Sequence, residues 1–213
     1  MRVIAGQFRS RTLEAPAGLD TRPTSDRLRE TLFNVLAPRI EGAAFLDLYA
    51  GSGAVGIEAL SRGAASVTFV ERASTALGVL GANLARLGVI EGFRIHPGSV
   101  GAWLRRFVAG QAAGPKPGSN VGQKTVPVQT FDLVFLDPPY DAVAEYAATL
   151  ALLGGAADAL LSAGGLVVAE HRGKGGGKVR LEERYGELEC TRLLEQGDAA
   201  LSFYARRAMT YAV

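Results

Sequence analysis

The chain has 213 residues, of which 48% are hydrophobic and 21% are charged. This composition excludes a wholly disordered chain, and the length fits one full domain with a modest extension. The 23 basic and 21 acidic residues leave a net charge of +2, which argues against a protein that coats nucleic acid along its length. Any contact with a polyanion is therefore expected to be local.

Cysteine content and hydropathy indicate the cellular compartment expected for the protein. Cys190 is the only cysteine, so we expect neither an intrachain disulfide nor a cysteine-based zinc site, and no metal. Arg2 and Arg9 bracket the first short apolar run, unlike a signal peptide, and no apolar run is long enough to span a bilayer. We therefore expect a soluble protein of a reducing compartment, the cytoplasm, with no membrane partner. A monomer is the simplest expectation.

Residues 1–40 are expected to form a small, locally basic extension. Residues 2–15 alternate in polarity like a hairpin. Ser25 can cap a helix whose apolar residues recur at helical spacing until Pro38. The sequence thus predicts a hairpin and helix over residues 1–40, followed by a second domain over residues 41–213.

From residue 44 onward, short apolar runs alternate with amphipathic stretches, which is typical of a parallel sheet with crossover helices on both faces. The predicted strands are 45–49, 66–70, 93–96, 131–136 and 166–170. The predicted helices are 54–61, 74–87, 99–108 and 144–153. Residues 109–130 are expected to be a surface loop. Two tail strands, 178–185 and 201–205, are expected to pair antiparallel and bring the sheet to seven strands.

A glycine-rich turn follows the first strand. Gly51, Gly53 and Gly56 have the spacing of a dinucleotide fingerprint, and Glu71 ends the next strand 20 residues after Gly51. Glycines allow close approach to a ligand, the following helix directs free N–H groups at it, and a carboxylate at that position can bind both ribose hydroxyls. The pattern predicts a nucleotide-like cofactor. The alternatives are an empty strand-to-helix turn and, for Glu71, an ordinary solvated carboxylate.

Asp47 lies inside the apolar strand that leads to this turn. A carboxylate there is costly unless something pairs with it. It can face a cationic ligand group or accept a hydrogen bond from the loop. The ammonium and sulfonium charges of S-adenosylmethionine would suit it, whereas a pyrophosphate would be repelled.

The second informative string, Asp137-Pro138-Pro139-Tyr140, directly follows an apolar strand. Its two prolines lack backbone N–H groups, so the turn offers carbonyl oxygens without competing donors. Hydrogen bonds from an exocyclic base amine to Asp137 and to the Pro138 carbonyl would favour attack of its nitrogen on a methyl group. Tyr140 would stack on the base, which is worth about 1–3 kcal/mol. The alternative functions of this string are a rigid strand exit, helix capping by Asp137 and packing by Tyr140.

With these motifs the chain resembles the RsmD-type S-adenosylmethionine-dependent 16S rRNA guanine-N2 methyltransferases. The resemblance covers nearly the whole chain and rests on Met1-Arg-Val-Ile-Ala-Gly6, Thr21-Arg-Pro-Thr24 through Arg29-Glu-Thr-Leu-Phe33, Leu46-Asp-Leu-Tyr-Ala-Gly-Ser-Gly53, Glu58-Ala-Leu-Ser-Arg-Gly63, Glu71 and Asp137-Pro-Pro-Tyr140. It implies an α/β, Rossmann-like class I methyltransferase fold. It also implies methylation of guanine 966 of 16S rRNA in an assembling small subunit.

The resemblance assigns roles to individual residues. The catalytic turn would be Asp137, Pro138, Pro139 and Tyr140. The S-adenosylmethionine site would comprise Asp47, Tyr49, Gly51, Ser52, Gly53, Glu71, Arg72, Ser99, Val100 and Asp137. Ser99 stands where relatives often carry an acidic or amide residue for the adenine amine. Because arginine forks match phosphate oxygens, the expected RNA contacts are Arg2, Arg9, Arg11, Arg22, Arg27 and Arg29; the alternative for each is a solvated helix-stabilising charge.

Other functions remain open at this point. An adenine-N6 methyltransferase would use the same acceptor turn, and a glutamine-amide methyltransferase usually has Asn in place of Asp137. An NAD-dependent oxidoreductase would explain the glycines and Glu71 but not residues 137–140. A non-catalytic rRNA-binding assembly factor would retain the pocket without activity.

Overall fold

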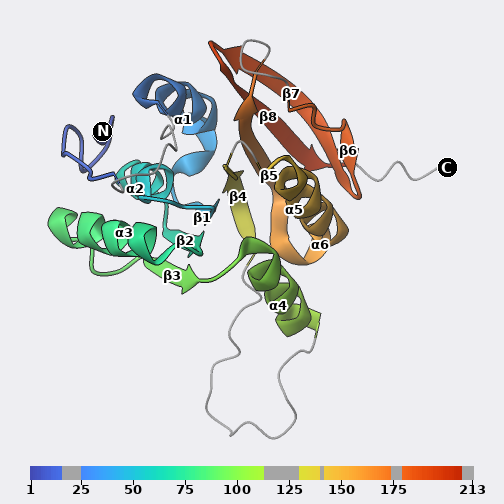
Figure 1. Cartoon of the computed structure of the whole chain (residues 1–213), viewed down its shortest axis with the longest axis horizontal. Coiled ribbons are helices and arrows are strands. Elements are labelled where there is room, and N and C mark those ends of the chain that lie inside the picture. Colours follow the sequence, from blue (N-terminus) through green and yellow to red (C-terminus); the bar gives the residue numbers. More distant parts are fainter. Residues whose placement is uncertain (16–24, 113–129, 140–141, 174–178, 208–213) are drawn as a thin grey trace, which may run out of the picture.

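The computed structural model describes residues 1–15, 25–112, 130–139, 142–173 and 179–207. These residues form one eight-stranded sheet with the order β3-β2-β1-β4-β5-β8-β7-β6, with helices on both sides (Figure 1). The α/β class I architecture and the helices on both faces are confirmed. The sheet has eight strands, however, and not the seven expected from the sequence.

The first five strands run parallel. They are β1 (Ala44–Leu48), β2 (Ser66–Glu71), β3 (Phe93–Pro97), β4 (Phe131–Leu136) and β5 (Leu161–Arg172). β5 is longer than predicted because its first half, which contains Gly164 and Gly165, continues beside β4 after a register shift. This half of the strand was not predicted, because glycines are uncommon inside strands and usually indicate a turn.

Six helices lie in the described part of the chain: α1 (Asp26–Ile40), α2 (Ala54–Ser61), α3 (Ser74–Leu87), α4 (Val100–Ala112), α5 (Val143–Gly155) and α6 (Ala157–Leu160). The backbone N–H of Leu28 donates to Ser25 Oγ over 3.2 Å, which confirms the predicted cap. α1 runs two residues past Pro38, since a proline near the end of a helix removes only one hydrogen bond.

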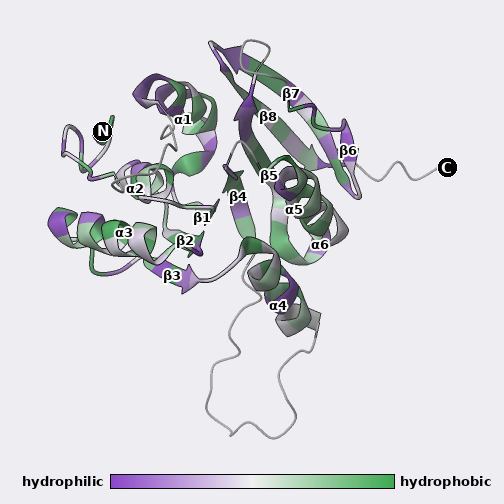
Figure 2. Ribbon diagram, viewed as in Figure 1, coloured by the Kyte–Doolittle hydropathy of each residue, from purple (hydrophilic) through white to green (hydrophobic). Residues whose placement is uncertain are grey.

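Side chains alternate across the sheet and fill two separate cores. Phe45, Phe69 and Phe135 face the core under α1, α2 and α3, whereas Leu48 and Leu136 face the core under α4, α5 and α6. Figure 2 shows apolar residues along central strands β4 and β5, and hydrophilic residues on β3 and β6 near the edges of the sheet. Strands covered on both faces thus have the continuous apolar runs seen in the sequence.

The antiparallel end of the sheet differs from the prediction. β8 (Ala199–Arg206) contains the predicted strand 201–205, but it pairs with β5 and with β7 (Leu188–Gln196), not with residues 178–185. Of that predicted strand, only β6 (Arg184–Tyr185) forms among the described residues, and it pairs with β7. β7 was missed because only one of its nine side chains, that of Leu188, is buried and three are charged, as expected near a sheet edge.

The N-terminal segment folds back on itself as the predicted hairpin, with an antiparallel bridge between Arg2 and Thr12 and backbone hydrogen bonds from Val3 N to the Arg11 carbonyl, from Ser10 N to the Val3 carbonyl and from Leu13 N to the Met1 carbonyl. Backbone groups between its two arms bind α2. The N–H groups of Ile4 and Ala5 donate to Glu58, and the N–H of Phe8 donates to Ser61 Oγ. The described part of residues 1–40 also shares a hydrophobic core with the sheet; its division from residues 41–213 as a separate domain stays a prediction. The described residues include no helix long and apolar enough to cross a membrane.

Candidate active site

The two motifs of the sequence meet at the carboxyl ends of two central strands. β1 and β4 are parallel neighbours, with Leu48 paired to Leu136, so Tyr49 and Asp137 leave adjacent strand ends. β1 connects outward to β2 and β3 on one side, while β4 and β5 extend the sheet on the other. Such a reversal of strand order opens a crevice at the carboxyl ends of the strands, where open α/β sheets bind ligands.

Two glycines are required by geometry: Gly53, in the turn after β1, and Gly56, in the first turn of α2. Gly53 caps α2 with a left-handed φ of 79°, and a Cβ there would lie 2.2 Å from Leu80 Cδ1. A Cβ on Gly56 would lie 2.2 Å from Phe69 Cε1. The turn therefore brings the N-terminus of α2 tightly against β2, with its positive end at the crevice.

Glu71, at the end of β2, organises both neighbouring turns. Its Oε2 accepts from the N–H of Gly51 over 2.8 Å, and its Oε1 accepts from Arg72 N and Ala73 N over 2.7 and 2.8 Å. The side chain is nearly buried, whereas that of Arg72 is exposed. Since each carboxylate oxygen can accept two hydrogen bonds, Oε1 is fully used and Oε2 keeps one acceptor site for a ligand hydroxyl.

Asp47 is buried beneath the same turn. Its Oδ2 accepts from the N–H of Gly56 over 2.9 Å, which matches the loop-binding alternative considered from the sequence. Burial raises its pKa from 3.8 to about 7; the hydrogen bond from Gly56 opposes this rise, and the negative charge of Glu71 adds to it.

This raised pKa predicts a pH-dependent stability. Between about pH 4 and about pH 7 the Asp47 carboxyl is protonated in the folded chain but ionised in the unfolded chain. The free energy of unfolding therefore falls as the pH rises through this range. Asp47→Asn keeps an oxygen that can accept from Gly56 N, but its side chain does not ionise. From pH 5 to pH 8 the free energy of unfolding of the variant should therefore rise relative to that of the wild type, by up to about 3 kcal/mol. Urea unfolding at both pH values measures this gain, with exposed Asp198→Asn as control. The prediction would be contradicted if the free energies of unfolding of the variant and the wild type differed by the same amount at pH 5 and at pH 8.

Tyr49 adopts a left-handed backbone with a φ of 62°, which is uncommon for a bulky residue and costs about 1–3 kcal/mol. Its hydroxyl donates to Glu145 Oε2 over 2.8 Å and lies 2.7 Å from Thr149 Oγ1. Burial raises the pKa of this hydroxyl, so it stays protonated. The Tyr49 side chain thus binds α5, and a contact of this residue with a cofactor remains a prediction.

The turn after β4 has the acceptor character expected from its prolines. The carbonyl of Pro138 accepts from the Tyr146 hydroxyl over 3.1 Å, and that of Pro139 accepts from Ala142 N over 2.8 Å. Pro138 is buried and Asp137 is half-buried. Tyr140 lies outside the described residues, so its stacking role remains a prediction.

The loop after β3 lies beside the Glu71 turn, because Gly98 N donates to the Glu71 carbonyl over 2.8 Å. Ser52, of the glycine turn, is buried, and its carbonyl accepts from the side chain of Asn83. Ser99 is exposed at the start of α4, whereas Val100 is buried in the core. Of Ser99 and Val100, only Ser99 offers an accessible side-chain hydrogen-bonding group.

The predicted RNA-binding arginines are not equivalent. Arg2, Arg9, Arg11 and Arg27 are exposed. The prediction for Arg29 is wrong, because its guanidinium is fully buried and binds Asp26 Oδ1 over 2.9 Å and the carbonyl of Arg2. Arg22 lies outside the described residues.

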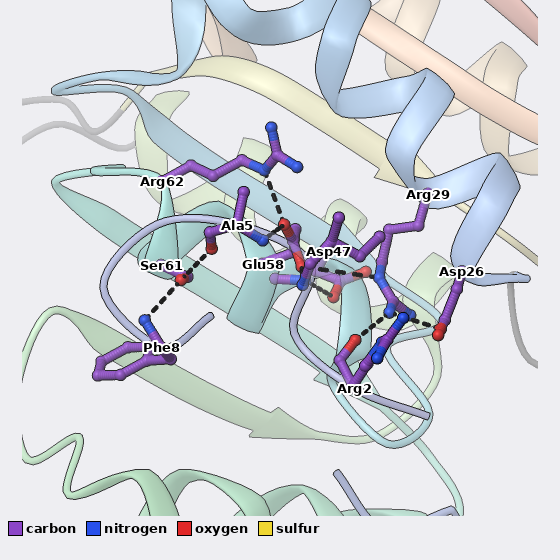
Figure 3. Close-up of polar contacts among 11 residues, drawn as sticks. Arg2, Ala5, Phe8, Asp26, Arg29, Asp47, Glu58, Ser61 and Arg62 are labelled. Atoms are coloured by element: carbon purple, nitrogen blue, oxygen red, sulfur yellow. Dashed lines mark hydrogen bonds and ion pairs between the residues drawn. The ribbon is translucent and has the colours of Figure 1, made fainter. Parts of the chain in front are cut away.

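Glu58, on α2, is a central structural group that the sequence analysis did not single out. Its carboxylate accepts from Ile4 N, Ala5 N and Arg62 Nε over 2.8, 3.0 and 2.7 Å. Arg29 Nε lies 3.8 Å away, and both side chains are fully buried. Figure 3 shows Glu58 between Arg62 and Arg29, with Asp47 nearby. A charged residue on an otherwise apolar helix was the available signal.

Comparison with known proteins decides the family. The family model described as "Conserved hypothetical protein 95" matches residues 1–113 and 116–205. YlbH of Bacillus subtilis (strain 168), provisionally named an rRNA methyltransferase, is 35% identical over 97% of this chain and 100% of its own length. The chain belongs to the RsmD-type family of S-adenosylmethionine-dependent methyltransferases.

Two further relatives agree with this membership. Ribosomal RNA small subunit methyltransferase D of Escherichia coli (strain K12) is 42% identical over 66% of this chain, a match that spans 60% of the E. coli protein. The solved structure of E. coli yhhF, provisionally named a methyltransferase, superposes with a TM-score of 0.74 at 31% identity, covering 98% of this chain and 99% of the other. The RsmD-type fold therefore extends through the described sheet.

Proposed function

We propose that this RsmD-type protein transfers a methyl group from S-adenosylmethionine to the N2 amine of guanine 966 in 16S rRNA. Its substrate would be a small-subunit assembly intermediate in the cytoplasm, and it would act as a monomer. The observation that carries the proposal is the adjacency of two turns, because the glycine turn after β1 and the acceptor turn after β4 leave paired strand ends. The names of the relatives support rRNA as the substrate class.

The residues around the glycine turn fit S-adenosylmethionine. Glu71 retains one acceptor site, on Oε2, for a ribose hydroxyl. Gly51 leaves room for a ligand next to the turn, because a Cβ there would meet only the Tyr49 carbonyl, 4.0 Å away. Exposed Ser99 and the Arg72 backbone border the same region. Asp47 would act mainly through the turn that it holds, by accepting the hydrogen bond from Gly56 N. S-adenosylmethionine would supply an electrophilic methyl group on a sulfonium.

The acceptor turn would prepare the nitrogen that attacks. The lone pair of an exocyclic amine is delocalised into its base, and hydrogen bonds from the amine to Asp137 and to the Pro138 carbonyl would localise it on nitrogen. These acceptors would also stabilise the positive charge that develops on nitrogen during attack. Tyr140 would hold the base by stacking. Much of the rate would come from holding the nitrogen in line with the methyl group.

The test uses small subunits from a strain that lacks its own enzyme, incubated with the protein and labelled S-adenosylmethionine. Mass spectrometry of the rRNA then locates the label. We expect one methyl group on the N2 amine of guanine 966. Label on an adenine N6 would support the adenine enzyme instead, and no incorporation into intact or stripped subunits would favour a non-catalytic assembly factor.

The exposed arginines of the N-terminal segment and α1 are the proposed RNA contacts. Each phosphate contact that is lost reduces the salt dependence of binding, because fewer counterions are released. Replacing Arg2, Arg9 and Arg27 with Gln should therefore lower the slope of log K against log salt by about 2–3. Filter binding of a 16S rRNA fragment measures the slope, with exposed Arg184 and Arg192 of the opposite sheet end replaced as control. A slope equal to that of the wild type would place the RNA site elsewhere.

A further inference from the structure

Helix α5 contacts both turns of the candidate site through its first two turns. Glu145 and Thr149 bind the hydroxyl of Tyr49 in the glycine turn, and Tyr146 binds the Pro138 carbonyl in the acceptor turn. α5 packs beside α4 and α6 on one face of the sheet (Figure 1). One rigid element therefore connects the two turns that the proposed reaction must align.

The contact between Tyr146 and Pro138 is built into the core. The Tyr146 side chain has no exposed surface and lies among the apolar residues under α5. A hydroxyl in such surroundings is costly unless it is hydrogen-bonded, and it donates to the Pro138 carbonyl over 3.1 Å. Because a carbonyl oxygen has two lone pairs, this bond fixes the direction of the carbonyl and leaves one lone pair for another donor.

The contact with Tyr49 holds the other turn. Tyr49 is one of two non-glycine residues with a positive φ in the described part of the chain, so its backbone must be stabilised by its surroundings. Its hydroxyl is held by Glu145 Oε2 over 2.8 Å and by Thr149 Oγ1 over 2.7 Å, and Thr149 is itself buried. The strained turn is thereby tied to the helix that also fixes Pro138.

We propose that Tyr146 is a positioning residue for methyl transfer, and that α5 sets the spacing between the two turns. Tyr146 would aim the Pro138 carbonyl at the attacking amine, while Tyr49, bound to Glu145 and Thr149, would keep the glycine turn in register with it. This inference rests on the proposed function, because it concerns the alignment of donor and acceptor in that reaction.

The test compares three Tyr→Phe changes that each remove one hydrogen-bonded hydroxyl. Tyr146→Phe should lower kcat about 10-fold, with little change in the Kd for S-adenosylmethionine or the KM for the subunit. Tyr49→Phe should instead weaken S-adenosylmethionine binding about 5-fold. Tyr204→Phe is the matched control: its ring is buried in the same core, but its hydroxyl donates to the Glu182 carbonyl, over 2.9 Å.

Thermal unfolding of each variant separates positioning from stability. A Tyr146→Phe protein with the kcat of Tyr204→Phe, at equal loss of Tm, would overturn the role of Tyr146. Unaltered cofactor affinity in Tyr49→Phe would overturn the role of α5 at the glycine turn. In both cases the wild type still methylates rRNA, and the proposed function stands. A wild type without transfer would overturn the function itself and the positioning role with it.

Discussion

Asp137→Ala is expected to reduce methyl transfer by about 10²–10⁴-fold while leaving the affinity for S-adenosylmethionine within about 2-fold. The reason is that the carboxylate would accept a hydrogen bond from the amine as positive charge develops on it, an interaction stronger in the transition state than in the bound substrate. Single-turnover transfer to small subunits measures the rate, and calorimetry measures the affinity.

Asp137→Asn sharpens this experiment. The amide keeps one oxygen that can accept the hydrogen bond but loses the negative charge, so its rate should fall between those of the wild type and Asp137→Ala. If both variants turned over at the wild-type rate, Asp137 would have no catalytic role. If both lost cofactor affinity and rate in proportion, Asp137 would serve binding instead of catalysis.

Glu58→Ala is expected to have the largest effect on stability. The change removes the acceptor for the hydrogen bonds from Ile4, Ala5 and Arg62, and it leaves the guanidinium of Arg29 buried beside a cavity. Breaking a buried ion pair on one side costs about 3–5 kcal/mol. For a chain of this length, about 2–4 °C of Tm is lost per kcal/mol, so Tm should fall by about 6–20 °C.

Hydrogen exchange shows where that stability is lost. The amides of Ile4 and Ala5, which donate to Glu58, should lose protection first, and the segment that they belong to should separate from α2. Glu41→Ala, on an exposed residue after α1, is the control and should change Tm by no more than about 2 °C. A Glu58→Ala protein as stable as this control would show that Arg29 does not depend on Glu58.

The parallel half of the fold was predictable from local patterns. The predicted bounds of α2, α3 and β4 agree with the structure, because each element has a recognisable pattern of apolar residues that is bounded by turn residues. β7 was not predictable, since a strand that has one buried side chain and contains Glu and Arg has no alternating apolar face. The N-terminal hairpin was predicted, but its attachment to α2 was not, because its hydrogen-bonding partners, Glu58 and Ser61, lie far from it in the sequence, beyond α1 and β1.

The candidate site was predictable where ligand chemistry itself imposes a residue pattern. Glycines at fixed spacing, Glu71 at a strand end and Asp137-Pro-Pro are such patterns. The residues that hold these turns were not found, because Tyr146, Glu145 and Thr149 look like ordinary members of an amphipathic helix. Arg29 shows the opposite error, because a role in RNA binding was predicted for a residue that is structural. Its place in a basic segment suggested phosphate binding, whereas in the fold it is buried beside Glu58, a residue distant in the sequence.

The central claim is that the methyl donor and the acceptor turn meet where β1 and β4 end. A crystal structure with S-adenosylhomocysteine tests it most directly. We expect Glu71 to hydrogen-bond a ribose hydroxyl and the sulfur to face Asp137 and the Pro138 carbonyl, with space between them for a purine. A cofactor bound away from the glycine turn, or a sulfur separated from Asp137 by packed side chains, would contradict the account.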